Sequence, residues 1–298
     1  MPFEPDYFVP EDRRAYSIEA GPVGVLILHG FMGSPTSSMP LAAYLAERQI
    51  SMHCPLLPGH GELPNKLHGV PYRAWIEEAE EGLAVLRQRC REIFLMGHSM
   101  GTVLSAHLIW KHLDIPIRGI IMLAPLYDVP SRAIKLIRFL RPVVPWFYPL
   151  RFKRMTKLVH ERLHDFDPTL DLDDPAVQAR LPQMTRVPTS GIDEMRKMAD
   201  IGRGLWSQID VPALIFQGGK DIAVSEGNAQ HVYNLLPNED KKLHFFPRAG
   251  HELMRPFEPV HEEVWTAVYN FIRQRSSLEN VSRRDAEAQR IFYELYAN

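Results

Sequence analysis

Apolar residues follow two different spacings along this chain. In some places four or more stand together in a short run, and in others they recur every three or four positions. Short runs are typical of buried β-strands, and the wider spacing is typical of helices with one apolar face. Strands are predicted at residues 25–28, 52–57, 93–96, 120–123, 213–216 and 243–246. Helices are predicted at residues 41–48, 72–90, 102–112, 225–235 and 259–273.

The predicted strands and helices alternate, which indicates an α/β fold with a mostly parallel central sheet flanked by helices. The alternation stops between residues 127 and 209, where several helix-like pieces occur and no clear strand. We therefore expect residues 1–126 and 210–275 to form the core and residues 127–209 to form an inserted helical cap. Residues 276–298 are polar and predict a helical extension that packs on the core or pairs two copies in a homodimer.

A serine stands at the junction of a predicted strand and helix. Gly97, Ser99 and Gly101 match the pattern G-x-S-x-G, directly after the strand at 93–96 and before the helix at 102–112. This is the context of a nucleophile elbow, in which glycines let the backbone of a sharp turn approach the neighbouring helix. The helix N-terminus behind the serine favours the negative charge that develops in acyl transfer. Ser99 is therefore the candidate nucleophile.

A serine of ordinary pKa needs a general base. His251 follows the last predicted strand, and the ends of parallel strands lie at the same edge of a sheet as the nucleophile. Three other histidines are less well placed: His244 lies within a strand, the side chain of His98 should diverge from its neighbour Ser99, and His261 lies on the last helix. We expect His251 to be the base.

The acid that orients the base should follow an earlier strand, because the chain order on this architecture is serine, acid, histidine. Asp221 follows the strand at 213–216, and its 30-residue separation from His251 fits one helix and one strand. Asp128, after the strand at 120–123, is the second candidate. The oxyanion requires two donors, and the backbone N–H groups of Met100 and Phe31 are the best placed.

Several motifs together resemble the α/β-hydrolase superfamily, most of all bacterial carboxylesterases and monoacylglycerol lipases. They are the segments Leu28–Phe31, Pro58–Gly61, Gly97–Gly101, Gly219–Asp221 and Gly250–His251. The resemblance covers residues 24 to about 273. It implies the α/β-hydrolase fold, and hydrolysis of carboxylic esters through an acyl-enzyme by the triad Ser99, Asp221 and His251. A thioesterase, a lactonase or a carbon–carbon bond hydrolase would use the same triad, so these activities stay open.

The predicted cap combines positive charge with aromatic residues. Residues 131–162 contain nine lysines and arginines against Glu161 alone, interleaved with Trp146, Phe147 and Tyr148. We expect a lid over a pocket for an apolar acyl or aryl group, lined by these three aromatic residues and by His29 and His98. The alternative is transient contact with an anionic lipid surface, or in the extreme a lipid-surface binding protein without catalysis.

A second motif, His160-Glu161-Arg162-Leu163-His164, satisfies the zinc-protease pattern H-E-x-x-H. A working zinc site needs a third ligand and an apolar supporting helix, and charged residues surround this segment instead. We expect no metal there. The sequence contains neither a P-loop nor a dinucleotide fingerprint, so we expect no cofactor.

The composition argues against several other classes of protein. The chain has 298 residues, is 45% hydrophobic and carries a net charge of −2, which argues against a nucleic-acid partner. Cys54 and Cys90 are too few for a disulfide scaffold and suit a reducing compartment. Residues 1–17 contain no apolar signal segment, so we expect a cytoplasmic protein. The uncharged runs at 20–46 and 93–110 are interrupted by glycines and, in the first run, prolines, which argues against membrane-spanning helices.

Overall fold

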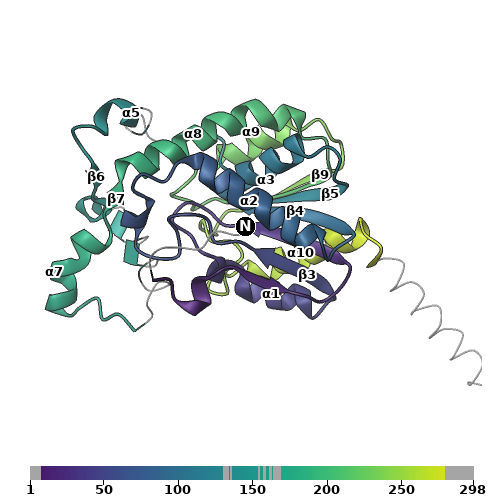
Figure 1. Cartoon of the computed structure of the whole chain (residues 1–298), viewed down its shortest axis with the longest axis horizontal. Helices are drawn as coiled ribbons and strands as arrows, with labels where there is room; N and C mark the ends of the chain where they lie inside the picture. Colours follow the sequence, from purple (N-terminus) through teal and green to yellow (C-terminus); the bar gives the residue numbers. More distant parts are fainter. Residues whose placement is uncertain are drawn as a thin grey trace, which may run out of the picture.

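The computed structural model describes residues 8–129, 134, 136–153, 155–156, 159–160, 163 and 169–278. Its centre is a seven-stranded sheet in the order β1-β3-β2-β4-β5-β8-β9 (Figure 1). Only β1 is antiparallel to its neighbour. The strands are β1 (Tyr16–Ile18), β2 (Val23–Leu28), β3 (Ile50–Cys54), β4 (Glu92–His98), β5 (Ile117–Leu123), β8 (Ala213–Gly218) and β9 (Lys241–Phe246).

All six predicted strands are therefore present, and the α/β prediction is confirmed. The strand predicted at 52–57 ends at Cys54, because Pro55 follows and has no N–H group for the ladder. The short edge strand β1 was not predicted. All residues of β2 and β8 are buried, as expected for strands covered on both faces.

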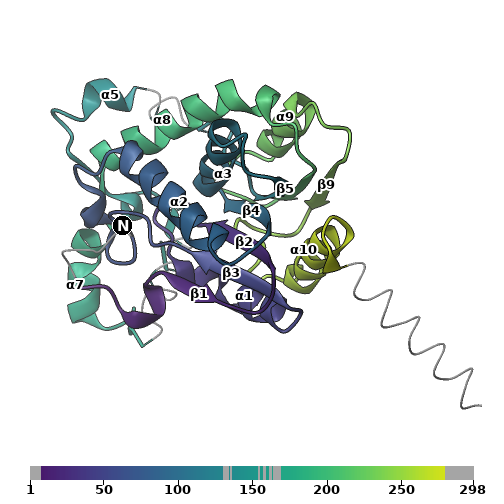
Figure 2. The same ribbon diagram turned by 45° about the vertical axis from the view of Figure 1, so that its right-hand side comes forward.

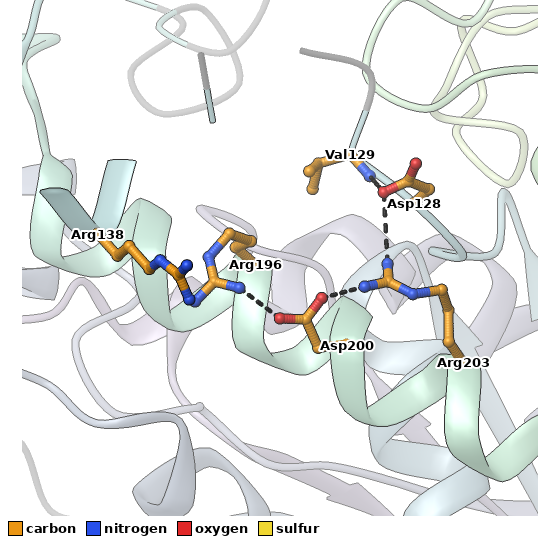
Figure 3. Close-up of a pocket in the computed structure, with 6 residues that line it drawn as sticks. All are labelled: Asp128, Val129, Arg138, Arg196, Asp200 and Arg203. Carbon is orange, nitrogen blue, oxygen red and sulfur yellow. Dashed lines mark hydrogen bonds and ion pairs between the residues drawn. The ribbon is translucent and has the colours of Figure 1, made fainter. Parts of the chain in front are cut away.

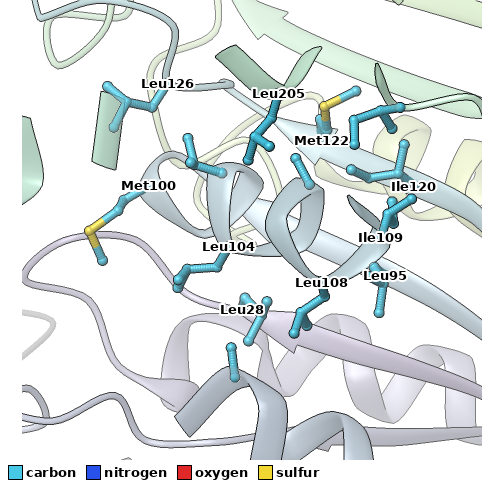
Figure 4. Close-up of a cluster of buried hydrophobic side chains, with 14 of the residues drawn as sticks. Leu28, Leu95, Met100, Leu104, Leu108, Ile109, Ile120, Met122, Leu126 and Leu205 are labelled. Carbon is cyan, nitrogen blue, oxygen red and sulfur yellow. The ribbon is translucent and has the colours of Figure 1, made fainter. Parts of the chain in front are cut away.

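Helices cover the two faces of the sheet and bury two separate hydrophobic clusters (Figures 1 and 2). Alternate residues of β2 divide between them, Leu26 and Leu28 into one cluster and Val25 and Ile27 into the other. The first face carries α2 (Tyr72–Arg87), α3 (Met100–Lys111) and α9 (Gly227–Leu235), and the second carries α1 (Met39–Ala46) and α10 (His261–Gln274). Figure 4 shows how residues of α3 such as Leu104 and Leu108 meet the strand residues Leu28 and Leu95.

Between β5 and β8 the chain forms the segment that we call the cap, residues 127–209. Its main described elements are α5 (Ile137–Leu140), β6 (Trp146–Phe147), α7 (Pro175–Met184), β7 (Val187–Pro188) and α8 (Thr189–Leu205). The expectation that this segment holds no strand is wrong, because β6 and β7 pair as a small antiparallel sheet. Two-residue strands, one of which ends in proline, are too short to give an alternating pattern.

Helix α8 runs from the cap back to the core and packs on α3. A Cβ added at Gly202 would lie 2.9 Å from a methyl group of Val103, so the two helices are in close contact. Within the described ranges, no helix has the length and apolar character needed to cross a membrane. Of the extension predicted at 276–298, the structure describes only residues 276–278.

Candidate active site

Ser99 stands on a strained turn between β4 and α3. Its backbone has φ 53° and ψ −117°, a conformation that L-residues avoid. The turn is fixed on both sides: the Ser99 N–H donates to the Leu123 carbonyl at 2.9 Å, and the Thr102 hydroxyl donates to the Ser99 carbonyl at 2.6 Å. Ser99 is half-buried, whereas its neighbours His98 and Met100 are buried. The strained turn thus presents the serine while hiding the residues around it.

The glycines of the motif are required by close backbone approach. A Cβ on Gly101 would overlap the carbonyl group of Leu28, and a Cβ on Gly97 would overlap the backbone of Gly101. Neither obstacle is a flexible side chain that could move aside. This segment therefore has the local geometry of the predicted nucleophile elbow.

Asp221 and His251 meet at the same edge of the sheet. Asp221 lies in the loop after β8, His251 lies in the loop after β9, and the His251 Nδ1 atom is 2.7 Å from Asp221 Oδ2. The other carboxylate oxygen, Oδ1, accepts the backbone N–H groups of Ala223 and Val224 at 2.8 and 2.9 Å. Both side chains are almost fully buried. The imidazole is thereby held in the tautomer that carries its proton on Nδ1.

Burial alone would raise the pKa of the Asp221 carboxyl. The positive charge available on His251 and the hydrogen bonds from His251, Val224 and Ala223 outweigh burial, and the pKa of Asp221 is lowered from its ordinary value. Asp221 is therefore a carboxylate at neutral pH. It is placed to stabilise a positive charge on the imidazole.

The loop after β2 lies directly beside the serine. A Cβ added at Gly30 would be 3.1 Å from the Cβ of Ser99. The next residue, Phe31, packs edge-on against Trp75, with ring centroids 6.1 Å apart. Met100 begins α3, where the first N–H groups of a helix lack intrahelical acceptors. The segments that carry the predicted oxyanion donors Phe31 and Met100 thus flank Ser99.

His29 and His98, which we predicted to line the pocket, are both buried and bonded to backbone. The His98 Nε2–H donates to the His251 carbonyl at 3.0 Å. His29 donates from Nδ1 to the Gly30 carbonyl at 3.0 Å, and its Nε2 accepts the Leu57 N–H at 3.2 Å. The structure places both imidazoles where they hold loops of the site together.

The sequence motif Pro58–Gly61 gave no indication of a role for His60. His60 is buried, and its ring lies edge-on to His29 and to Trp75 at 5.0 and 5.7 Å. Burial lowers the pKa of His60 to about 4, so the ring is neutral. Glu252 was also missed, although it follows His251 directly and is buried beside it.

The aromatic residues Trp146, Phe147 and Tyr148 are half-buried in and next to β6. Trp146 lies against His68 at 5.6 Å and under the Arg186 guanidinium at 4.1 Å. Phe147 stacks on Phe152, and Tyr148 contacts Arg151. Within the part of the chain that the structure describes, these ring contacts join cap residues and the loop at His68. They do not join the three aromatics to Ser99, Asp221 or His251.

A cavity of about 410 Å³ opens within the cap, between α8, α5 and the residues that follow β5 (Figure 3). Arg203 of α8 bridges Asp200 and Asp128 across it. Asp128, our second candidate for the acid, is thus engaged by a cap arginine. The cavity is lined by Asp128, Val129, Arg138, Arg196, Asp200 and Arg203. Of the H-E-x-x-H motif, Glu161, Arg162 and His164 lie outside the described residues.

Comparisons with known proteins agree with this architecture. Residues 23–259 match the family model described as serine aminopeptidase, S33. A thermostable monoacylglycerol lipase from Bacillus sp. (strain H-257) is 29% identical over 243 residues, which are 80% of this chain and 86% of that protein. A carboxylesterase from Bacillus subtilis (strain 168) is 24% identical over 259 residues, 85% of this chain and 94% of that protein. The solved structure of a metagenome-derived lipolytic enzyme has a TM-score of 0.73 at 21% identity and covers 90% of this chain and 100% of that one, which confirms the fold.

Proposed function

The chain belongs to the serine aminopeptidase S33 family, and from this membership and the site geometry we propose that it is a serine hydrolase of carboxylic esters. The observation that carries the proposal is the 2.7 Å bond between Asp221 and His251, at the sheet edge where Ser99 stands on its strained turn. A buried carboxylate bonded to an imidazole, and a half-buried serine held at φ 53°, are the parts that acyl transfer requires.

In the proposed reaction the Ser99 hydroxyl attacks the ester carbonyl while His251 takes its proton. The backbone N–H groups of Phe31 and Met100 stabilise the tetrahedral oxyanion. The alcohol leaves with the proton from His251, and an acyl-enzyme remains on Ser99. Water activated by His251 then releases the acid and restores the serine. Asp221 keeps its charge throughout and stabilises the imidazolium.

We propose an ester with an apolar acyl or aryl group as the substrate, with a monoacylglycerol as the first compound to try. The support comes from the monoacylglycerol lipase and the carboxylesterase among the relatives, and from the aromatic content of the cap. In this proposal the cap, residues 127–209, covers the acyl chain while the core supplies the chemistry.

One substrate panel tests this proposal. Chromogenic esters from acetyl to palmitoyl and a series of 1-monoacylglycerols are compared with a thioester, a lactone and an aminoacyl anilide, using wild type and Ser99→Ala. We expect ester turnover that Ser99→Ala abolishes in a protein with unchanged circular dichroism. Ester turnover by folded Ser99→Ala would refute the serine mechanism. If only the thioester, the lactone or the anilide were turned over, Ser99 would remain the proposed nucleophile, but the proposed substrate class would be wrong.

We also propose that the cap touches anionic lipid surfaces transiently. In α5 and the residues around it, five apolar side chains are exposed next to Arg138 and Arg141: Leu136, Phe139, Leu140, Val143 and Val144. Apolar residues interleaved with arginines suit the boundary between headgroups and acyl chains. Co-sedimentation with phosphatidylglycerol vesicles should fall in a Phe139→Ser, Val143→Ser variant, and equal binding by the variant would refute this contact.

A further inference from the structure

Three buried side chains that commonly ligate metals meet beside Ser99. His98, His251 and Glu252 each offer one ligand atom, and these atoms lie within 4.8 Å of one another. All three residues are at most 8% exposed. We propose that this cluster binds one zinc ion or a similar divalent transition metal, and that the bound ion inhibits the hydrolase.

The donor set fits zinc. Two imidazoles and one carboxylate form a common three-ligand zinc set, which leaves a fourth position for water. Tetrahedral coordination with bonds of about 2.1 Å places neighbouring ligand atoms roughly 3.4 Å apart, so separations of at most 4.8 Å must shorten by up to about 1.4 Å to bind the ion. Gly30 lies beside Nδ1 of His98 and Cβ of Ser99. Because glycine has no side chain, it does not fill the space next to the cluster.

Both histidines also have the supporting hydrogen bonds that metal ligands use. A ligating histidine usually donates its other N–H group to a backbone carbonyl or a carboxylate. Here His98 donates from Nε2 to the His251 carbonyl at 3.0 Å, and His251 donates from Nδ1 to Asp221 at 2.7 Å. These bonds leave Nδ1 of His98 and Nε2 of His251 as the ring nitrogens with a lone pair for the ion. Any proton carried by a ligand is released when the ion binds.

The inhibitory part of the inference rests on the proposed function. In the reaction proposed above, Nε2 of His251 takes the proton of Ser99. An ion on Nε2 occupies the lone pair that this step needs, so the serine stays protonated and acyl transfer stops. Substrate and zinc then compete for the site around Ser99 and His251.

Two ligand variants test the site against a matched control. Zinc chloride is titrated into wild type, His98→Asn and Glu252→Gln, and each residual activity is referred to the metal-free activity of the same protein. His160→Asn, in the H-E-x-x-H motif, is the control. We expect the half-inhibitory zinc concentration to rise at least tenfold in the two ligand variants and to stay unchanged in the control. Wild-type sensitivity in both ligand variants, or loss of sensitivity in the control alone, would overturn the site.

Two measurements on the wild-type chain separate this inference from the proposed function and from any folding defect of the variants. Cobalt chloride should give the visible absorption of a four-coordinate cobalt ion, whichever substrate the enzyme takes. An anomalous difference map of a zinc-soaked crystal should place one ion about 2.0–2.2 Å from His98, His251 and Glu252. An ion elsewhere, or none, would overturn the proposal, while an ion at the site without inhibition would point instead to a failure of His251 as the base.

Discussion

The Arg203 guanidinium on α8 lies 3.3 Å from Oδ1 of Asp128, in the loop that leaves the core after β5. Asp221 lies in the loop after the neighbouring strand, β8, and is bonded to His251 instead. Two aspartates at equivalent positions after adjacent strands therefore have different partners. Asp128 ties α8 to the loop that follows β5, and Asp221 orients an imidazole.

This difference predicts opposite outcomes for the same substitution. Asp221→Asn should lower kcat by about 10⁴-fold, because an amide at this position favours the wrong tautomer of His251. Asp128→Asn keeps the shape of the side chain and weakens a partly exposed ion pair, which is worth up to about 1 kcal/mol in stability. Its kcat should change by less than tenfold.

Steady-state kinetics on one chromogenic ester measures both variants. Circular dichroism checks that each is folded, and Asp128→Asn is the control for loss of a loop aspartate. If Asp128→Asn were the more damaging change to kcat, the acid would have to be reassigned from Asp221 to Asp128.

The backbone of Ser99 predicts that activity and stability trade against each other at this residue. Ser99→Ala and Ser99→Gly both remove the nucleophile, so both should be inactive. Only glycine adopts φ 53° with ψ −117° without strain, and such strain costs about 1–3 kcal/mol. The glycine variant should therefore unfold at a higher urea concentration than the alanine variant, even though glycine is also more flexible when unfolded. A glycine variant that unfolds at a lower urea concentration than the alanine variant would show that the turn is not strained.

Gly101 and Gly204 form a matched pair for the packing of the elbow. A Cβ at Gly101 overlaps the Leu28 carbonyl, whereas a Cβ at Gly204 meets nothing within 4 Å. Gly101→Ala should destabilise the fold by several kcal/mol, in the range of severe core defects. Gly204→Ala, at an exposed position of α8, should stabilise the fold by about 0.5–1 kcal/mol. Urea unfolding of both variants gives the comparison, and a stable Gly101→Ala protein would contradict the close approach.

The sequence predicted the parts of this fold that depend on short, local patterns. Apolar runs identified six of the seven strands of the central sheet, and the glycine spacing around Ser99 identified the elbow. Chain order then selected Asp221 and His251, because parallel strands bring their ends to one edge. The strand pairing of β6 with β7 had no such signal, since each strand is two residues long.

Long-range contacts explain what the sequence did not predict about the site. His98 was expected to diverge from Ser99 and to line the pocket, but nothing in the sequence indicated that it donates to the carbonyl of His251, 153 residues away. Its proximity to Glu252 depends on how two loops fold back over the sheet, and no spacing in the sequence encodes that distance. The contacts of Trp146 with His68 and Arg186 likewise arise from tertiary packing.

Two buried histidines predict how stability depends on pH. Burial lowers the pKa of both His53 and His60 to about 4. In the unfolded chain their pKa values return to about 6.5, so between pH 6.5 and 4 the unfolded state binds more protons. Stability must therefore fall as the pH decreases through this window. The lowered pKa of Asp221 acts in the same direction at lower pH, where the unfolded carboxylate begins to bind protons.

Each histidine should contribute about 3 kcal/mol of lost stability by pH 4, from a pKa difference of about 2.5. His53→Gln does not titrate, so its unfolding free energy should depend less steeply on pH, by up to about 1.4 kcal/mol per pH unit between pH 6.5 and 4. Urea unfolding of wild type and variant across this range measures the slope difference, and an NMR titration of the His53 ring reads its pKa directly. Parallel slopes, together with a ring that titrates near 6.5 in the folded protein, would show that burial does not hold His53 neutral.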